Sequence, residues 1–469
     1  MSGNLRFRAG KRPCFGRPDW LSFGLTTGLV FLVYGRSLSA DVDLNKGGIF
    51  ATAAAYAGVP HPPGFPLWTI LGWLFIKLLP FSNIAWRLAV FSALTGALSC
   101  GVIALMTSRG GLALLKIFPL NARPSPTDAR RLRIAGGCSA GGIFGLNGAL
   151  WGKTVVVDVW PLTILWCSLT FCLFICWLHR PRRTGLLAAA FLVYGLALVN
   201  SESVLVLAPA IPFVVALGRR DAGRNFALLC SSLFIVGILA PPHTYASLLR
   251  PDEFAPPSLH LLYRLIGFSL LALTIVLVVV TRRATGGWRV TLLCTGVFAV
   301  VQLLHLYPAI ASMSNPPVNW AYPRIHQGWA HLLLRGQYEG LQPSKDLGTF
   351  VHQMALYVGT TAREYGVGEM LLAIVPFVLW RRLNRAARKS LIALFLFFLG
   401  GSLLLVAVLN PQADRQSVTM LKAYFTISYL PLAIGTGQGL ILLGCMLARR
   451  TPAAGPPTAN RLAQSAPVR

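Results

Sequence analysis

The chain has 469 residues, of which 55% are hydrophobic and 12% are charged, and its formal net charge is +28. A mean hydropathy of +0.63 lies above the range of soluble domains and excludes an ordinary soluble enzyme. The positive charge does not indicate a nucleic-acid partner, because the basic residues form short clusters between apolar runs instead of one basic face.

Twelve apolar runs are predicted to cross a membrane as helices. Placing the arginine and lysine clusters on the cytoplasmic side requires an even number of crossings between successive clusters. The runs are 20–35, 86–106, 134–152, 159–178, 185–200, 203–218, 225–241, 259–281, 288–308, roughly 366–380, 389–409 and 423–447. We expect an all-α, polytopic protein of about 12 transmembrane helices, in the bacterial inner (plasma) membrane, with both termini cytoplasmic.

The beginning of the chain has two interpretations. A basic arm and an apolar run to Tyr34 are followed by Ser37, Leu38, Ser39 and Ala40, which resembles a signal peptide with its cleavage site. An uncleaved first helix is favoured, because the later topology uses that helix. The expected organisation is a basic cytoplasmic arm (1–19), a membrane-embedded domain (20–448) and a disordered cytoplasmic tail (449–469).

One further apolar run, 66–79, is predicted not to cross. It is bounded by Pro66 and Pro80, and 14 helical residues extend only about 21 Å against a hydrocarbon core of about 30 Å. We expect it to lie as a juxtamembrane helix on the external side.

The positions of the carboxylates indicate on which side of the membrane the functional site lies. With this topology, all but three of the 14 acids lie at or beyond the external boundary, the exceptions being Asp19, Asp128 and Asp221. Acids have little influence on insertion, so their position is independent of the charge rule. Their collection at one face predicts an external site.

Several segments carry a resemblance to a known family. The most specific is Gly58 to Leu67, in which His61 is followed by two prolines and a glycine, so that the backbone is rigid and then turns sharply. The other segments are Trp68–Gly72, Asn83–Arg87 leading into Ser92–Leu94, Trp151–Trp160, Gly195–Asn200, and Asn315–Trp320 with Arg335–Tyr338. Together they resemble the multi-spanning membrane family whose animal member is a protein O-mannosyltransferase of the secretory pathway.

The resemblance implies a C-type glycosyltransferase fold with an external active site. It implies transfer of a sugar from a polyprenyl-phosphate carrier, with an acid of the first external loop activating the acceptor hydroxyl. Relatives carry an Asp-Ser-Gly-Glu type motif a fixed distance before the histidine segment, and its acidic positions fall here on Lys46 and Ile49. Asp43, and after it Asp41, are therefore the candidate bases, with a solvated loop acid as the alternative for each.

Substrate binding is expected from side chains at the same face. Arg324 and Arg335 flank a matched segment, and guanidinium suits phosphate, although either can instead contact lipid headgroups. Asp158 marks a membrane boundary and either binds substrate or caps a helix. The remaining substrate-binding candidates are His61, Glu202, Trp320 and Lys422.

The sequence thus predicts a membrane glycosyltransferase with a polyprenyl-phosphate donor and a protein or glycan acceptor. The alternatives are a transporter or flippase of a lipid-linked solute, and a non-catalytic relative that binds carrier lipid. No metal-ligand cluster and no cofactor motif is recognised, and a requirement for a divalent metal is left open.

Overall fold

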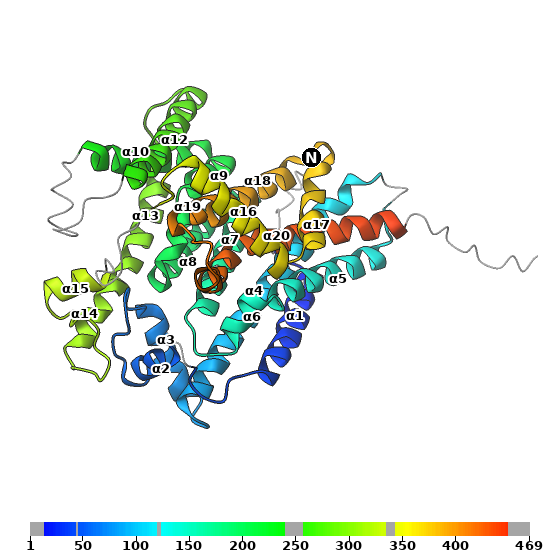
Figure 1. Cartoon of the computed structure of the whole chain (residues 1–469). Coiled ribbons are helices and arrows are strands. Elements are labelled where there is room, and N and C mark those ends of the chain that lie inside the picture. The colour runs from blue at the N-terminus through cyan, green and yellow to red at the C-terminus, as the bar shows by residue number, and fades with distance from the viewer. Residues whose placement is uncertain (1–13, 44–45, 120–122, 240–256, 334–342, 449–469) are drawn as a thin grey trace, which may run out of the picture.

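The computed structural model describes residues 14–43, 46–119, 123–239, 257–333 and 343–448 (Figure 1). The first part of the chain forms α1 (Arg17–Arg36), α2 (Gly47–Tyr56), α3 (Pro66–Leu78), α4 (Ile84–Leu114), η1 (Leu115–Ile117), α5 (Pro126–Gly145), α6 (Gly148–Thr154), α7 (Trp160–Leu178), α8 (Thr184–Asn200), η3 (Glu202–Leu207), α9 (Ala210–Gly218) and α10 (Arg220–Leu239). The rest forms α12 (Pro257–Thr281), α13 (Trp288–Gln302), η4 (Leu303–Leu306), α14 (Tyr307–Ser312), α15 (His326–Leu333), α16 (Leu347–Glu364), α17 (Val367–Val378), η5 (Trp380–Arg382), α18 (Arg385–Leu399), a π-helical turn (Gly400–Leu404), α19 (Leu405–Leu409) and α20 (Arg415–Ala448).

Six helical segments among the described residues are long and apolar enough to cross a bilayer. They are Ile84–Ile117, Trp160–Leu178, Leu261–Thr281, Trp288–Ser312, Arg385–Leu409 and Arg415–Leu447. Shorter apolar helices at Pro66–Leu78, Thr184–Asn200 and Val367–Val378 accompany them. The chain is therefore an all-helical, multi-pass membrane protein.

Most of the predicted runs coincide with a helix, but two are divided. The run 134–152 is divided because α5 ends at Gly145, and Asn147 then caps a new helix by accepting a hydrogen bond from the Leu150 amide at 3.0 Å. The run 203–218 is divided into a 3-10 segment and the nine-residue α9. Neither part of the second run is of spanning length by itself.

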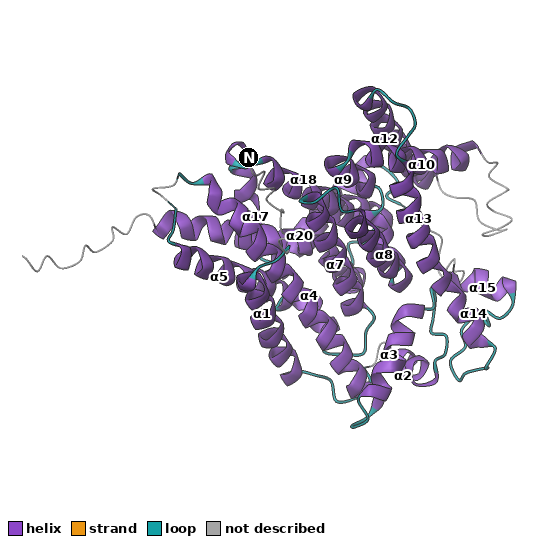
Figure 2. Ribbon diagram, turned by 180° about the vertical axis from the view of Figure 1, so that it is seen from behind, coloured by secondary structure: helices purple, strands orange, loops and turns teal. Residues whose placement is uncertain are grey.

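Helix α4 lies at the centre of the arrangement. It packs against α1, α5, α7 and α20, and 83% of its apolar window is buried. Figures 1 and 2 show α10 and α12 as a pair at the opposite side of the molecule from α1 and α5. The short helices α2 and α3 lie at one edge of the molecule together with α14 and α15.

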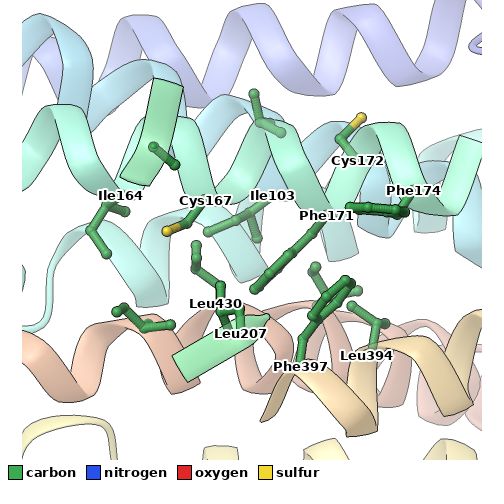
Figure 3. Packing of buried hydrophobic residues seen from close by; sticks show 14 of the residues in the cluster. Ile103, Ile164, Cys167, Phe171, Cys172, Phe174, Leu207, Leu394, Phe397 and Leu430 are labelled. Atoms are coloured by element: carbon green, nitrogen blue, oxygen red, sulfur yellow. The ribbon is translucent and has the colours of Figure 1, made fainter. Parts of the chain in front are cut away.

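The largest buried apolar cluster joins α7, α18 and α20 (Figure 3). Phe171 and Phe397 stack with ring centroids 4.4 Å apart, and Leu207 and Leu430 complete the contact between the helices. By contrast, α12 and α13 expose apolar side chains such as Val279 and Val300. Such apolar outer faces are what helices in contact with lipid require.

Candidate functional site

The loop between α1 and α2 lies against the segment that connects α6 to α7. The Ser39 amide donates to the Val155 carbonyl at 2.8 Å, and Trp151 Nε1 donates to Ser37 Oγ at 3.0 Å. This contact brings the first loop, which the sequence predicts to be catalytic, next to the segment that contains Asp158.

The two candidate bases of this loop differ in their surroundings. Asp41 is exposed and its carboxylate accepts a hydrogen bond from the Val42 amide beside it, at 2.8 Å. Asp43 is half-buried, and its Oδ1 accepts a hydrogen bond from the Gly47 amide, at 3.0 Å, in the first turn of α2. Asp43 is thus turned towards the molecule, whereas Asp41 lies on its surface.

Asp158 forms an ion pair with Lys153. The distance from Lys153 Nζ to Asp158 Oδ2 is 2.9 Å, while Asp158 Oδ1 accepts from the Trp160 amide at 2.8 Å. The Asp158 carboxylate raises the pKa of Lys153, partial desolvation opposes the shift, and the charge of Asp43 adds to the increase. Lys153 therefore stays protonated, and Asp43 lies within electrostatic range of it.

A second ion pair lies on the other side of α6. Lys422 Nζ is 2.9 Å from Glu364 Oε1. Glu364 lies close to the start of α6, since a Cβ built on Gly148 would be 2.9 Å from its Oε2. Helix α6 therefore has one ion pair near each end, and we call Asp43, Lys153, Asp158, Glu364 and Lys422 the charged cluster.

Aromatic side chains connect the charged cluster to α20. The rings of Trp160 and Tyr424 are 4.8 Å apart, and Trp160 Nε1 donates to Thr426 Oγ1 at 2.8 Å. Tyr424 also lies within electrostatic range of Lys153. The first turn of α7 and the first half of α20 are thus held together beside the two ion pairs.

His61 does not belong to the charged cluster. Only 5% of its surface is exposed, and it packs against Phe50 and Phe65 with ring centroids 5.1 and 5.3 Å away. Its Nδ1 lies 3.0 Å from the Pro62 carbonyl oxygen. These contacts favour a packing role in the loop over the predicted contact with substrate.

Two of the segments that carry the resemblance contact each other although they lie about half the chain apart. The Val59 amide donates to the Val318 carbonyl at 2.8 Å, and the Trp320 amide donates to the Val59 carbonyl at 3.0 Å. Gly58 permits this approach, because a Cβ there would lie 2.5 Å from the Val318 oxygen. The side chain of Trp320 itself remains 38% exposed.

The remaining predicted residues are not part of the charged cluster. Arg324 is exposed and lies over the Tyr322 ring, 5.8 Å from its centroid. Glu202 is half-buried at the start of η3. Arg335 lies outside the described residues. The structure therefore brings Asp43 and Asp158 to one end of α6 and Lys422 to the other, whereas Asp41 and Arg324 are exposed on the surface.

Lys153 and Glu364 were not among the predicted site residues. Lys153 stands five residues before Asp158 in one of the matched segments. A lysine so close in sequence to a candidate acid could have been recognised as its ion-pair partner. Glu364 had no such signal, because its partner Lys422 is 58 residues away. Among the described residues, no group of three or more histidine, cysteine or carboxylate side chains is arranged to hold a metal ion.

Comparison with known proteins shows which family this part of the chain resembles. Residues 47–223, which contain α2 to α9, match the family model described as the protein O-mannosyl-transferase TMEM260 N-terminal domain. The family resemblance is confirmed. The TMEM260-like region contains His61, Lys153, Asp158 and Glu202, and it begins after Asp43.

Two curated relatives carry the same name. The chain is 26% identical to protein O-mannosyl-transferase TMEM260 of Mus musculus over 247 residues, which is 50% of this chain and 32% of the mouse protein. It is 30% identical to the tmem260 protein of Dictyostelium discoideum over 70 residues, which is 14% of this chain and 8% of that protein. The chain thus matches about a third of the length of the mouse relative, and over this region it resembles O-mannosyltransferase-like membrane proteins.

Proposed function

We propose that this chain is a membrane glycosyltransferase that moves a sugar from a polyprenyl-phosphate carrier to an acceptor hydroxyl on the external face. The observation that carries the proposal is the position of Asp43, at the first turn of α2 and in a loop that lies against the segment between α6 and α7, which contains the Lys153–Asp158 pair. A carboxylate beside a fixed cation meets two needs of the reaction, a base for the acceptor and a positive charge for the phosphate.

In the proposed step, Asp43 takes the proton of the acceptor hydroxyl. The acceptor oxygen bonds to the anomeric carbon while the bond from that carbon to the carrier phosphate breaks, and both electrons leave with the phosphate. Lys153 and Lys422 oppose the negative charge that develops there. A lysine ammonium has three donors, and the ion pair between Lys153 and Asp158 uses one of them.

The position of Asp43 also suggests how this chain compensates for the two acids of the family motif, whose positions are occupied here by Lys46 and Ile49. Lys46 immediately precedes α2 and Ile49 lies in its first turn. Asp43 turns back to the same helix end, where it accepts the hydrogen bond from Gly47. A carboxylate three residues earlier in the chain thus reaches the turn in which the family's acids are expected, and this supports Asp43 as their replacement.

The carrier chain needs an apolar surface near this face. A pocket of about 220 Å³, lined by Ala57, Ile70, Trp73 and Tyr307, lies beside the loop that contains His61. We assign the first part of the polyprenyl chain to this pocket. The relatives' names favour mannose as the sugar and a protein as the acceptor. The charge clusters favour cytoplasmic termini, while the relatives come from mouse and Dictyostelium and give no support to the bacterial inner membrane expected from the sequence.

The proposal is tested with the purified full chain in lipid nanodiscs, supplied with polyprenyl-phosphate mannose and a serine- and threonine-rich peptide. Asp43→Asn should lower the transfer rate by about 10²–10⁴-fold, as loss of a general base does. Asp128→Asn, at an exposed acid in the first turn of α5, is the neutral control. Loss of transfer in Asp41→Asn with normal transfer in Asp43→Asn would overturn the assignment of the base.

The alternatives give different results in the same experiment. A chain that binds the carrier but transfers no sugar, with any acceptor offered, is the non-catalytic relative. A chain that moves a fluorescent carrier lipid between leaflets, without transfer, is a flippase. Either result would reject the glycosyltransferase.

A further inference from the structure

A cavity of about 360 Å³ lies far from the charged cluster. It is formed where the ends of α4 and α7 meet the start of α18 and the second half of α20, together with Cys14 and Phe15. Trp160 stands at one end of α7 beside the charged cluster, and the cavity is lined by Cys172, Ile175 and Cys176 towards the other end of this helix, at least about 18 Å further along its axis. The two places are therefore separate sites.

The polar lining of this cavity is basic. Arg109 and Arg180 are half-buried in its wall, and Lys116 and His179 stand exposed at its rim. None of the described residues that line it is an aspartate or a glutamate. The buried Gln438, whose amide lies against Gly110, adds a neutral polar group to the wall.

Helix ends offset only part of this positive charge. The carboxyl ends of α4 and α7 contribute about −0.5 elementary charge each, which does not balance even the two charges of Arg109 and Lys116. The start of α18, which reaches the cavity at Asn384 and Ala386, has the opposite sign. The pKa of His179 is lowered mainly by desolvation, and the charges of Arg109 and Arg180 lower it further.

The rest of the wall is apolar. Met106, Leu391, Leu394 and Ile434 lie behind the cationic rim, on α4, α18 and α20. The volume is within the range of pockets that hold small molecules, about 300–1,000 Å³. A cavity with cations on one side and aliphatic side chains on the other is suited to a ligand that is itself amphiphilic.

We propose that this cavity is a second binding site, which takes a phosphate-bearing amphiphile. The phosphate lies against Arg109 and Arg180, whose guanidinium groups suit phosphate oxygens, and the first part of the apolar chain lies along Leu391, Leu394 and Ile434. The proposal does not depend on the sugar-transfer reaction, because the residues involved are at the opposite end of α7.

Binding is measured with the purified full chain in a neutral detergent by isothermal titration calorimetry. The probes are dioctanoyl phosphatidic acid, dioctanoyl phosphatidylcholine and inorganic phosphate. We expect phosphatidic acid to bind at least tenfold more tightly than the other two. Equal binding of inorganic phosphate would show a site for the free anion, and equal binding of phosphatidylcholine would show a site for any lipid chain, and each overturns the proposal.

Variants locate the bound lipid. Arg109→Gln and Arg180→Gln should each weaken phosphatidic acid binding about tenfold or more, which is the strength of one charge-assisted hydrogen bond. Arg182→Gln, an exposed neighbour that does not line the cavity, is the matched control and should bind as the unmodified chain does.

Ala386→Trp keeps every charge and fills the cavity from an exposed position at the start of α18. It should also remove binding, while its thermal unfolding temperature in the absence of lipid stays near that of the unmodified chain. Unchanged affinity in this variant and in both arginine variants would place the lipid elsewhere and overturn the proposal.

Discussion

Lys153 Nζ and Asp158 Oδ2 lie 2.9 Å apart, and this ion pair fixes a cation at the junction of α6 and α7. The second oxygen of Asp158 accepts the hydrogen bond from the Trp160 amide at the start of α7. Ser92 on α4 donates to the Asp158 carbonyl oxygen at 3.2 Å. Asp158 therefore holds Lys153 in place and accepts a hydrogen bond from the first amide of α7, although the N-cap position of that helix is occupied by Val159.

The first prediction concerns carrier binding by Lys153. Lys153→Met removes the ammonium group and keeps the length of the aliphatic chain. We expect the dissociation constant for the polyprenyl-phosphate carrier to rise about 10- to 100-fold, because a hydrogen bond to a charged group contributes about 1.5–3 kcal/mol. The measurement is titration of the purified chain with a short-chain carrier.

Lys77→Met is the matched control, because Lys77 is an exposed lysine near the end of α3. It should leave the dissociation constant unchanged. If Lys77→Met and Lys153→Met weaken binding equally, the carrier contacts the surface charge of the chain in general and not the charged cluster.

The second prediction concerns the buried ion pair of Asp19 and Arg133. Arg133 Nη2 lies 2.5 Å from Asp19 Oδ1, Ser108 Oγ donates to the same oxygen at 2.7 Å, and Asp19 is fully buried. Asp19→Ala leaves the guanidinium group without its partner among α1, α4 and α5. We expect a loss of about 3–5 kcal/mol in the free energy of unfolding, the usual cost of breaking a buried pair.

Unfolding by a denaturing detergent, followed by circular dichroism, measures this loss. Asp128→Ala breaks the exposed pair of Asp128 and Arg131, which are 3.8 Å apart, and should cost no more than about 1 kcal/mol. Equal effects of the two substitutions would mean that the Asp19 pair does not stabilise the packing of α1.

The helices themselves were largely predictable from the sequence. Pro66 and Pro80 bracket an apolar run, and α3 extends from Pro66 to Leu78, since proline suits a first turn and cannot continue a helix. The break between α5 and α6 was not predicted, because the run 134–152 was assigned from its overall hydropathy, although it contains Asn147 followed by Gly148 at the break. Hydropathy measures the length of an apolar segment and does not detect a turn inside it.

The site was less predictable, because it depends on contacts between distant segments. Asp43 and Asp158 were nominated separately, and nothing in their spacing showed that the loop of Asp43 would lie against the turn of Asp158. For His61 the sequence left open contact with substrate and a role in the local fold, and its position between Phe50 and Phe65 was not visible from the sequence. Whether a polar residue faces a ligand or packs inside the fold is decided by tertiary structure, which a single sequence does not show.

The third prediction concerns the contact of the loop at Gly58 with the segment at Val318. Gly58→Ala places a methyl group 2.5 Å from the Val318 carbonyl oxygen, where the neighbour is backbone and cannot move cheaply. We expect the contact to open and limited proteolysis between α14 and α15 to be at least several-fold faster. Gly48→Ala is the control, since a Cβ there meets nothing within 4 Å and it lies in α2. Equal proteolysis rates in the two variants would show that the contact does not depend on Gly58.

The last prediction is topological: α3 does not cross the membrane. Its 13 residues extend about 20 Å, less than the hydrocarbon core of about 30 Å. One side of α3 is buried at Trp68 and Ile76, while Trp73, Leu74 and Lys77 on the other side are exposed. A short helix with one apolar side packed and a lysine on the other is suited to the surface of a leaflet.

The turn after α3 provides the position for the measurement. Arg87 holds this turn by donating from Nε to the Phe81 carbonyl at 2.8 Å and from Nη2 to the Ser82 carbonyl at 2.7 Å. Ser82 is exposed, so Ser82→Cys should react with a membrane-impermeant maleimide. If α3 stays at the external leaflet, this reaction occurs in sealed right-side-out vesicles. Ser125→Cys, exposed at the start of α5 beside a basic cluster, should react only after the vesicles are opened. Labelling of both positions only in opened vesicles would mean that α3 crosses the membrane. Asp43 and Ser82 would then lie on opposite sides of the membrane, and not both on the external side.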